Sequence, residues 1–140
     1  MRRIAVVLLA LGTHHISVAA EGEQLYAANC AACHQADGSG VASLAPPLRS
    51  DVWRRLGAKS SVYLASVLVS GLVGVPLDGQ RYGAAMPPWS YLSDAELAAI
   101  GSYVLQTLNG EKKGVSTTSI REARDANRDN EMLKQLREGS

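Results

Sequence analysis

The sequence of 140 residues contains no phenylalanine, and aromatic side chains make up only 5% of the chain. A small domain with so little aromatic volume is stabilised if a large apolar ligand completes its core. The chain also has almost no net charge, because 14 Lys and Arg stand against 13 Asp and Glu, which gives +1. Such a balance favours neither nucleic acid nor an anionic membrane surface as a partner.

Long apolar runs are missing as well, apart from residues 4–12. That run follows two arginines and precedes three small residues at 18–20, which is the pattern of a secretory signal peptide. It is much shorter than the roughly 20 apolar residues that a membrane-spanning helix needs. We therefore predict that residues 1–20 are a signal peptide cleaved after Ala20, that the protein is periplasmic, and that the mature chain has no membrane span. Loss of the two arginines changes the formal net charge from +1 to −1.

Cysteine occurs only twice, as Cys30 and Cys33, and His34 follows directly. The order C-x-x-C-H is typical of covalent c-type haem attachment, in which two thiols on one helical turn bind the vinyl groups of one porphyrin and the histidine binds the iron. A zinc site needs four ligands, and His34 is the only imidazole left after the signal peptide. A redox disulfide needs no following histidine, and no strand-turn-helix pattern surrounds the pair.

Three main helices are predicted from the spacing of apolar residues. The clearest boundaries belong to the third, which starts at a capping box formed by Ser93 and Glu96 and stops at Asn109 and Gly110. The expected helices are 21–32, 61–70 with Ser60 as its N-cap, and the segment from the capping box to Leu108.

The loop predicted at residues 35–47 ends in Pro46 and Pro47. Prolines have no N–H group, but their carbonyls can accept hydrogen bonds. A metal-bound histidine usually donates its other ring N–H to a carbonyl or a carboxylate, which orients the imidazole. The carbonyl of either proline is therefore a candidate partner for His34.

The opposite face of the iron depends on residues 82–89, an apolar loop that contains two prolines. A single mature imidazole excludes two histidine ligands from one chain, so a methionine sulfur is the alternative. Met132 lies among charged residues, whereas Met86 lies in the stiff loop, where little ordering entropy remains to be lost on binding. We predict His34 and Met86 as the two iron ligands.

Residues 111–140 differ in character, because 13 of these 30 residues are charged. A helix is predicted from Ser119 toward Arg137, with a broken apolar stripe. We expect this segment to be a solvated or partner-dependent extension, helical or flexible, outside the core. The predicted organisation is a signal peptide (1–20), one domain (21–110) and the charged extension (111–140).

These motifs resemble the class I c-type cytochromes, of the small single-haem type found beside periplasmic dehydrogenases and oxidases. The resemblance covers residues 22–108 and rests on the haem motif, Gly22 and Tyr26 in the first helix, the proline loops and Ile100 with Tyr103. It implies an all-α cytochrome c fold with three main helices around one haem c, and Pro46 as the partner of His34.

The resemblance also implies an electron-transfer protein rather than an enzyme. Its expected partners are a periplasmic dehydrogenase as donor and a terminal oxidase or another cytochrome as acceptor. Two alternatives stay open: a haem subunit permanently bound to a dehydrogenase, and a haem peroxidase or gas sensor with a displaceable Met86. Trp53, Tyr82 and Trp89 are candidates to hydrogen-bond the haem propionates. The equally weighted alternative is that each fills the core and that its polar group bonds to the protein.

Overall fold

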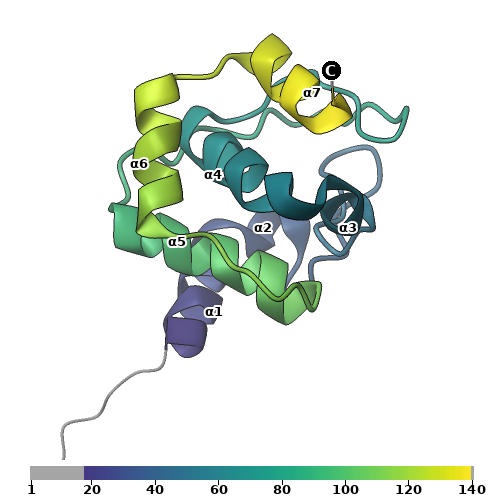
Figure 1. Ribbon diagram of the computed structural model, residues 1–140. Coiled ribbons are helices and arrows are strands. Elements are labelled where there is room, and N and C mark those ends of the chain that lie inside the picture. The colour runs from purple at the N-terminus through teal and green to yellow at the C-terminus, as the bar shows by residue number, and fades with distance from the viewer. Residues whose placement is uncertain (1–17, 140) are drawn as a thin grey trace, which may run out of the picture.

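Helices form all the regular secondary structure in residues 18–139, which are the residues that the computed structural model describes (Figure 1). The predicted all-α fold class is confirmed. Most of the signal peptide prediction falls on residues 1–17, outside the described residues. The helices are α1 (Val18–Asn29), α2 (Ala31–His34), α3 (Val52–Leu56), η1 (Gly57–Lys59), α4 (Ser60–Ser70), α5 (Asp94–Ser102), η2 (Tyr103–Leu108), α6 (Thr117–Ala126) and α7 (Asn130–Glu138).

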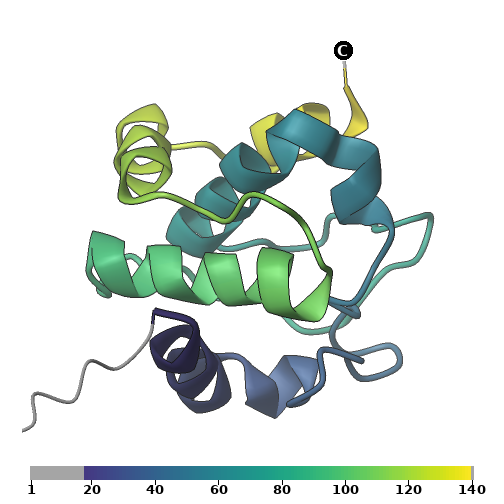
Figure 2. The ribbon, with the colours of Figure 1, turned by 60° about the horizontal axis from the view of Figure 1, so that its bottom comes forward.

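The third predicted helix is the central element of the fold. It begins at α5 with the capping box, in which the Ser93 hydroxyl accepts from the Glu96 N–H and the Glu96 carboxylate accepts from the Ser93 N–H. It continues as η2, a π-helical segment. Figure 2 shows α5 and η2 running between α1 on one side and α4 and α6 on the other. This helix therefore links the first helix to the rest of the core.

The contact between α1 and α5 depends on one small residue and one aromatic pair. A Cβ atom at Gly22 would lie 2.5 Å from the carbonyl oxygen of Ala99, so only glycine allows this approach. One turn further along, the rings of Tyr26 and Tyr103 pack with their centroids 5.1 Å apart. Gly22 and Tyr26, which carry part of the family resemblance, therefore pack the first helix against the third main helix.

The first two helices differ from prediction at their ends. The predicted helix 21–32 is interrupted at Cys30, and a separate turn, α2, carries the haem motif to His34. Ser60 is the first residue of α4 and not its N-cap, because η1 leads into the helix and the Ser60 hydroxyl donates to the Gly57 carbonyl. The short helix α3 was not predicted.

The charged C-terminal segment is not the solvated appendage that its composition suggests. Ile120, Ala123 and Leu133 are at most 1% exposed and belong to the hydrophobic core. Two helices replace the single predicted one, capped by Ser116 and Asp129 and separated at Asn127, which has a positive φ of 41°. The prediction failed because a few apolar residues, correctly spaced, suffice to bury one face of a strongly charged helix.

Polar contacts also join this segment to the preceding helices. Arg124 donates to the carboxylate of Asp94 at 2.9 Å and to the backbone carbonyls of Ser90 and Leu92. Arg128 donates to the hydroxyl of the buried Ser66 in α4. None of the helices in residues 18–139 has both the length and the apolar character required to cross a membrane.

Candidate haem site

A mainly apolar pocket opens between the helices and the two proline loops, and every site residue predicted from the sequence lines it. The polypeptide brings these residues together from four separate parts of the chain. They are Cys30, Cys33, His34, Pro46, Trp53, Tyr82, Met86 and Trp89. Further lining comes from apolar residues of α4 and of the loop after it, which include Leu64, Val67, Leu68, Leu72, Val75 and Leu77.

One side of this pocket, the proximal wall, consists of Cys30, Cys33, His34 and Pro46. Both thiols are free, and they lie one helical turn apart around the start of α2. Burial is the main cause that raises the pKa of Cys30 to about 12, with a smaller contribution from Cys33. A redox-active cysteine needs a lowered pKa, so Cys30 lacks the character of a thioredoxin-like nucleophile. Within residues 18–139 there is also no cluster of three His, Cys, Asp or Glu side chains suited to a metal ion.

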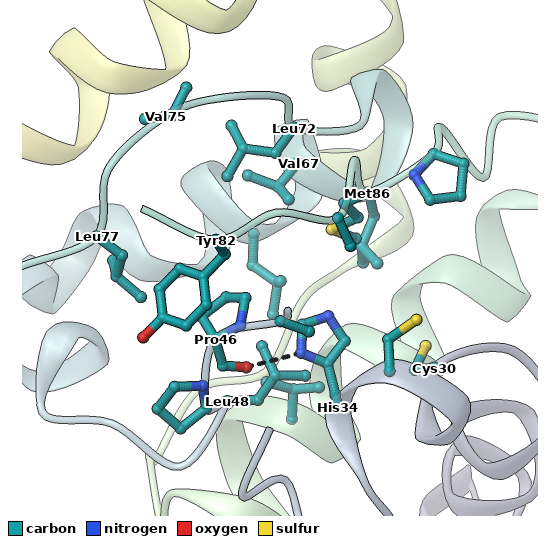
Figure 3. A pocket seen from close by; sticks show the side chains of 18 of the residues that line it. Cys30, His34, Pro46, Leu48, Val67, Leu72, Val75, Leu77, Tyr82 and Met86 are labelled. Carbon is teal, nitrogen blue, oxygen red and sulfur yellow. Dashed lines mark hydrogen bonds between the residues drawn. The ribbon is translucent and has the colours of Figure 1, made fainter. Parts of the chain in front are cut away.

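The imidazole of His34 is held in a defined orientation. Its Nδ1 lies 2.9 Å from the carbonyl oxygen of Pro46, which can only accept, so Nδ1 carries the proton (Figure 3). Nε2 is then the unprotonated nitrogen that can bind a metal. Burial is the main cause that lowers the pKa of His34, which favours the neutral ring that metal binding requires. Of the two prolines considered, Pro46 is therefore the acceptor.

The opposite side, the distal wall, consists of Leu72 and Met86. The backbones of Leu72 and Met86 exchange two hydrogen bonds of 3.0 and 2.9 Å, an isolated bridge between two loops. Figure 3 shows the Met86 side chain above His34, and Pro46 beside His34 on the side away from Cys30. The other candidate methionine, Met132, is 45% exposed on α7 and does not line the pocket.

The three candidate propionate-binding residues have different surroundings. The Trp53 indole N–H donates to the carbonyl of Leu48 at 2.7 Å, so its polar group already has a protein partner and its ring forms part of the wall. Trp89 is half-buried and packs against Tyr91 with ring centroids 5.7 Å apart. Tyr82 lies toward the end of the pocket away from Cys30 (Figure 3).

Sequence reasoning missed two polar residues of the pocket, Tyr63 in α4 and Arg137 in α7. Tyr63 lies in the helix predicted at residues 61–70, but nothing in the sequence marked it as a site residue. Arg137 was predicted only as the end of a solvated helix. The two residues are 74 positions apart and come within hydrogen-bonding distance of each other, at 3.5 Å. Local spacing carries no signal for such a distant contact.

The fold is all-α and surrounds an apolar pocket, with C-x-x-C-H on one wall and a methionine on the other. This combination is typical of haem-binding electron-transfer proteins. The sequence profile of the family described as "Cytochrome c" matches residues 19–108. The chain belongs to the cytochrome c family, and a domain of this family implies covalently bound haem c.

Three relatives illustrate the range of proteins to which the chain is similar. Cytochrome c-552 of Thermus thermophilus is 33% identical over 115 residues, which cover 81% of this chain and 76% of that protein. Cytochrome c6 of Cyanidium caldarium is 33% identical over 106 residues, 73% of this chain and 86% of that protein. The cytochrome c subunit of the quinone alcohol dehydrogenase of Gluconobacter oxydans is 31% identical over 105 residues, 74% of this chain and 22% of that protein.

The donor groups of the pocket fit such a haem. Two free thiols lie at one side, a neutral and oriented imidazole follows them, and a thioether lies across the cavity. Imidazole and thioether are the axial ligands that cytochromes c use. The mainly apolar lining suits the faces of a porphyrin, and a bound porphyrin would supply the large apolar volume that a chain without phenylalanine lacks.

Proposed function

We propose that the protein is a periplasmic one-electron carrier that holds one haem c, attached through Cys30 and Cys33, between His34 and Met86. The observation that carries this proposal is the buried His34 ring, oriented by Pro46 and facing a pocket with Met86 on its far wall. When bound, the haem supplies an iron that takes up and releases one electron.

The contribution of the chain is to fix the ligands and exclude water. The hydrogen bond to Pro46 keeps the imidazole in one orientation and raises its basicity as a ligand. A methionine opposite the histidine raises the reduction potential. The mainly apolar lining disfavours the extra positive charge of the ferric form and acts in the same direction. Ligands fixed before the reaction move little when the charge changes, which favours rapid transfer.

The proposed partners are redox proteins of the same compartment, with a periplasmic dehydrogenase as donor and a terminal oxidase or another cytochrome as acceptor. A second candidate is a haem subunit permanently bound to a dehydrogenase. Its support is the 31% identity to a protein named as the cytochrome c subunit of a quinone alcohol dehydrogenase. Co-purification distinguishes the two, because a subunit remains with its dehydrogenase through gel filtration and a carrier elutes alone.

The proposal is tested on the full chain expressed in a bacterium that matures c-type cytochromes. Cell fractionation is expected to release the protein with the periplasm, with Glu21 as its first residue. The haem should stay attached in acid acetone, and the spectrum should be low-spin in both oxidation states. A colourless periplasmic protein would overturn the proposal. Carbon monoxide binding by the unmodified reduced protein would instead indicate the peroxidase or gas-sensor alternative.

A further inference from the structure

Arg137 lies near the end of α7, well beyond the matched residues 19–108, and yet it lines the haem pocket. Its side chain is only 7% exposed. Among residues 18–139, it is the single side chain with a permanent charge in the pocket lining. A guanidinium is always ionised in proteins, so the fold places a buried positive charge beside a mainly apolar cavity.

The protein contacts of Arg137 do not neutralise this charge. Nη2 donates to the carbonyl of Pro76 at 2.6 Å, and Nη1 lies 3.5 Å from the hydroxyl of Tyr63. Both partners are uncharged. The nearby carboxylate belongs to Glu138, 3.4 Å from Nη2 and 56% exposed, where water weakens the attraction. A guanidinium has five N–H donors, and the carboxylate of Glu138 is largely exposed, so burial of this weakly compensated charge costs free energy that a buried anion would offset.

Pro76 fixes the end of the pocket at which this guanidinium lies. Its neighbours Val75 and Leu77 lie on the opposite side of the pocket from Cys30 (Figure 3). In a c-type haem the two thioether bonds form on one half of the porphyrin, and the two propionates extend from the other half. The cysteines therefore direct the propionates toward the end where Pro76 holds Arg137.

We propose that Arg137 binds a haem propionate, so that the C-terminal segment supplies part of the cofactor site and raises the reduction potential. The inference rests on the proposed function, because it requires a haem between His34 and Met86. A guanidinium matches a carboxylate with two parallel N–H donors. Tyr63 is 4% exposed, and its hydroxyl lies 3.5 Å from Nη1 of Arg137, so it can contact the same propionate carboxylate.

The sign of the effect follows from charge. The ferrous site carries one positive charge less than the ferric site, so a nearby cation favours the ferrous form. A cation that neutralises a propionate also removes a negative charge that would favour the ferric form. Loss of the Arg137 charge should therefore lower the reduction potential. We expect about a tenfold change in the equilibrium constant for reduction, which for one electron corresponds to about 59 mV.

The test compares Arg137→Gln and Arg137→Lys with Arg121→Gln in the full-length holoprotein. Arg121 is an exposed arginine of the neighbouring helix α6, and its replacement makes the same change in net charge away from the pocket. Spectroelectrochemical titration should give a lowered potential for Arg137→Gln, a smaller decrease for Arg137→Lys and the wild-type value for Arg121→Gln. NMR of the reduced wild-type protein should show nuclear Overhauser contacts between the Arg137 guanidinium and propionate methylene protons.

Equal reduction potentials in Arg137→Gln and Arg121→Gln would overturn the inference. If Arg137 only stabilised the fold through its hydrogen bond to Pro76, Arg137→Gln would be less stable but would keep the wild-type potential. If Arg137→Gln does not accumulate, the wild-type NMR contacts decide, and their absence would also overturn it. Failure of the proposed function is seen separately and earlier, as a wild-type protein without attached haem.

Discussion

In the proximal wall the candidate ligand His34 ends a helix, whereas in the distal wall Met86 lies in a loop with no helical residue beside it. His34 is 7% exposed and its ring is bonded to Pro46. Met86 is half-buried and is held by two backbone hydrogen bonds to Leu72. The difference lies in how each ligand is held: His34 through its own side chain, and Met86 through its backbone.

Of the substitutions that test this difference between the two walls, removal of the histidine should have the largest effect. His34→Ala removes the imidazole and leaves the Pro46 carbonyl without its partner, so we expect loss of the low-spin spectrum and little mature protein. Absorption spectra and haem staining of periplasmic extracts measure both effects. Gln24→Ala, an exposed change in α1, serves as the control. A low-spin spectrum unchanged in His34→Ala would exclude this residue as the ligand.

Removal of the methionine should have a narrower effect. Met86→Ala is expected to keep the haem attached, because both cysteines remain, but to lower the reduction potential and allow carbon monoxide to bind the reduced protein. The control is Met132→Ala, which removes an exposed thioether from α7. If the two variants had identical spectra and potentials, Met86 would not be the ligand.

The proximal wall could be predicted from the sequence because its parts lie close together in the chain. The haem motif and Pro46 span residues 30–46, and the capping box of α5 spans only four residues. Each is a local pattern with a direct physical meaning. The pairing of Met86 with Leu72 was not predicted, although the stiff proline loop indicated the methionine itself.

The C-terminal segment shows where such prediction fails. Its charged composition suggested a solvated tail, but Ile120 and Ala123 are three positions apart on α6 and fill the core with Leu133 of α7. Arg137 reaches the pocket through contacts 61 and 74 positions away. No local spacing predicts which charged residue of an amphipathic helix folds back onto a cavity.

The C-terminal segment also supports the distal wall, and a core substitution there tests how strongly. Asn130 at the start of α7 accepts a hydrogen bond from the Val73 N–H, one residue after Leu72, and α7 packs on α4. Leu133 is fully buried, so Leu133→Ala should reduce the free energy of unfolding by about 2–5 kcal/mol. Urea unfolding of the holoprotein gives the value. The control Met132→Ala should change the free energy of unfolding by less than about 0.5 kcal/mol. If both variants lost the same small amount, the C-terminal segment would be a loosely attached extension.

A smaller change can be directed at the support of Met86 alone. Gly71 has φ 73° and ψ −178°, and a Cβ atom there would lie 2.6 Å from the Met86 carbonyl oxygen. Gly71→Ala should cost about 1–3 kcal/mol and weaken the sulfur-to-iron charge-transfer band, because the side chain pushes the Met86 backbone away. Gly79→Ala shares the positive φ, 77°, but its Cβ meets nothing within 4 Å. The control should therefore lose stability without loss of the band, and a weakened band in both variants would contradict the steric argument.

The smallest expected effect lies on the proximal wall and tests its rigidity. The Tyr26 hydroxyl donates to the carbonyl of Gln35 at 2.8 Å and so ties α1 to the first residue after His34. Tyr26→Phe removes this bond while the ring can still pack on Tyr103, so we expect a loss of about 0.5–1.5 kcal/mol in unfolding free energy. Tyr91→Phe, at a ring that is 72% exposed, should lose almost nothing. The Pro46 bond still orients His34 in Tyr26→Phe, so its reduction potential should equal that of the wild type; a lowered potential would mean that the imidazole depends on more than its one carbonyl partner.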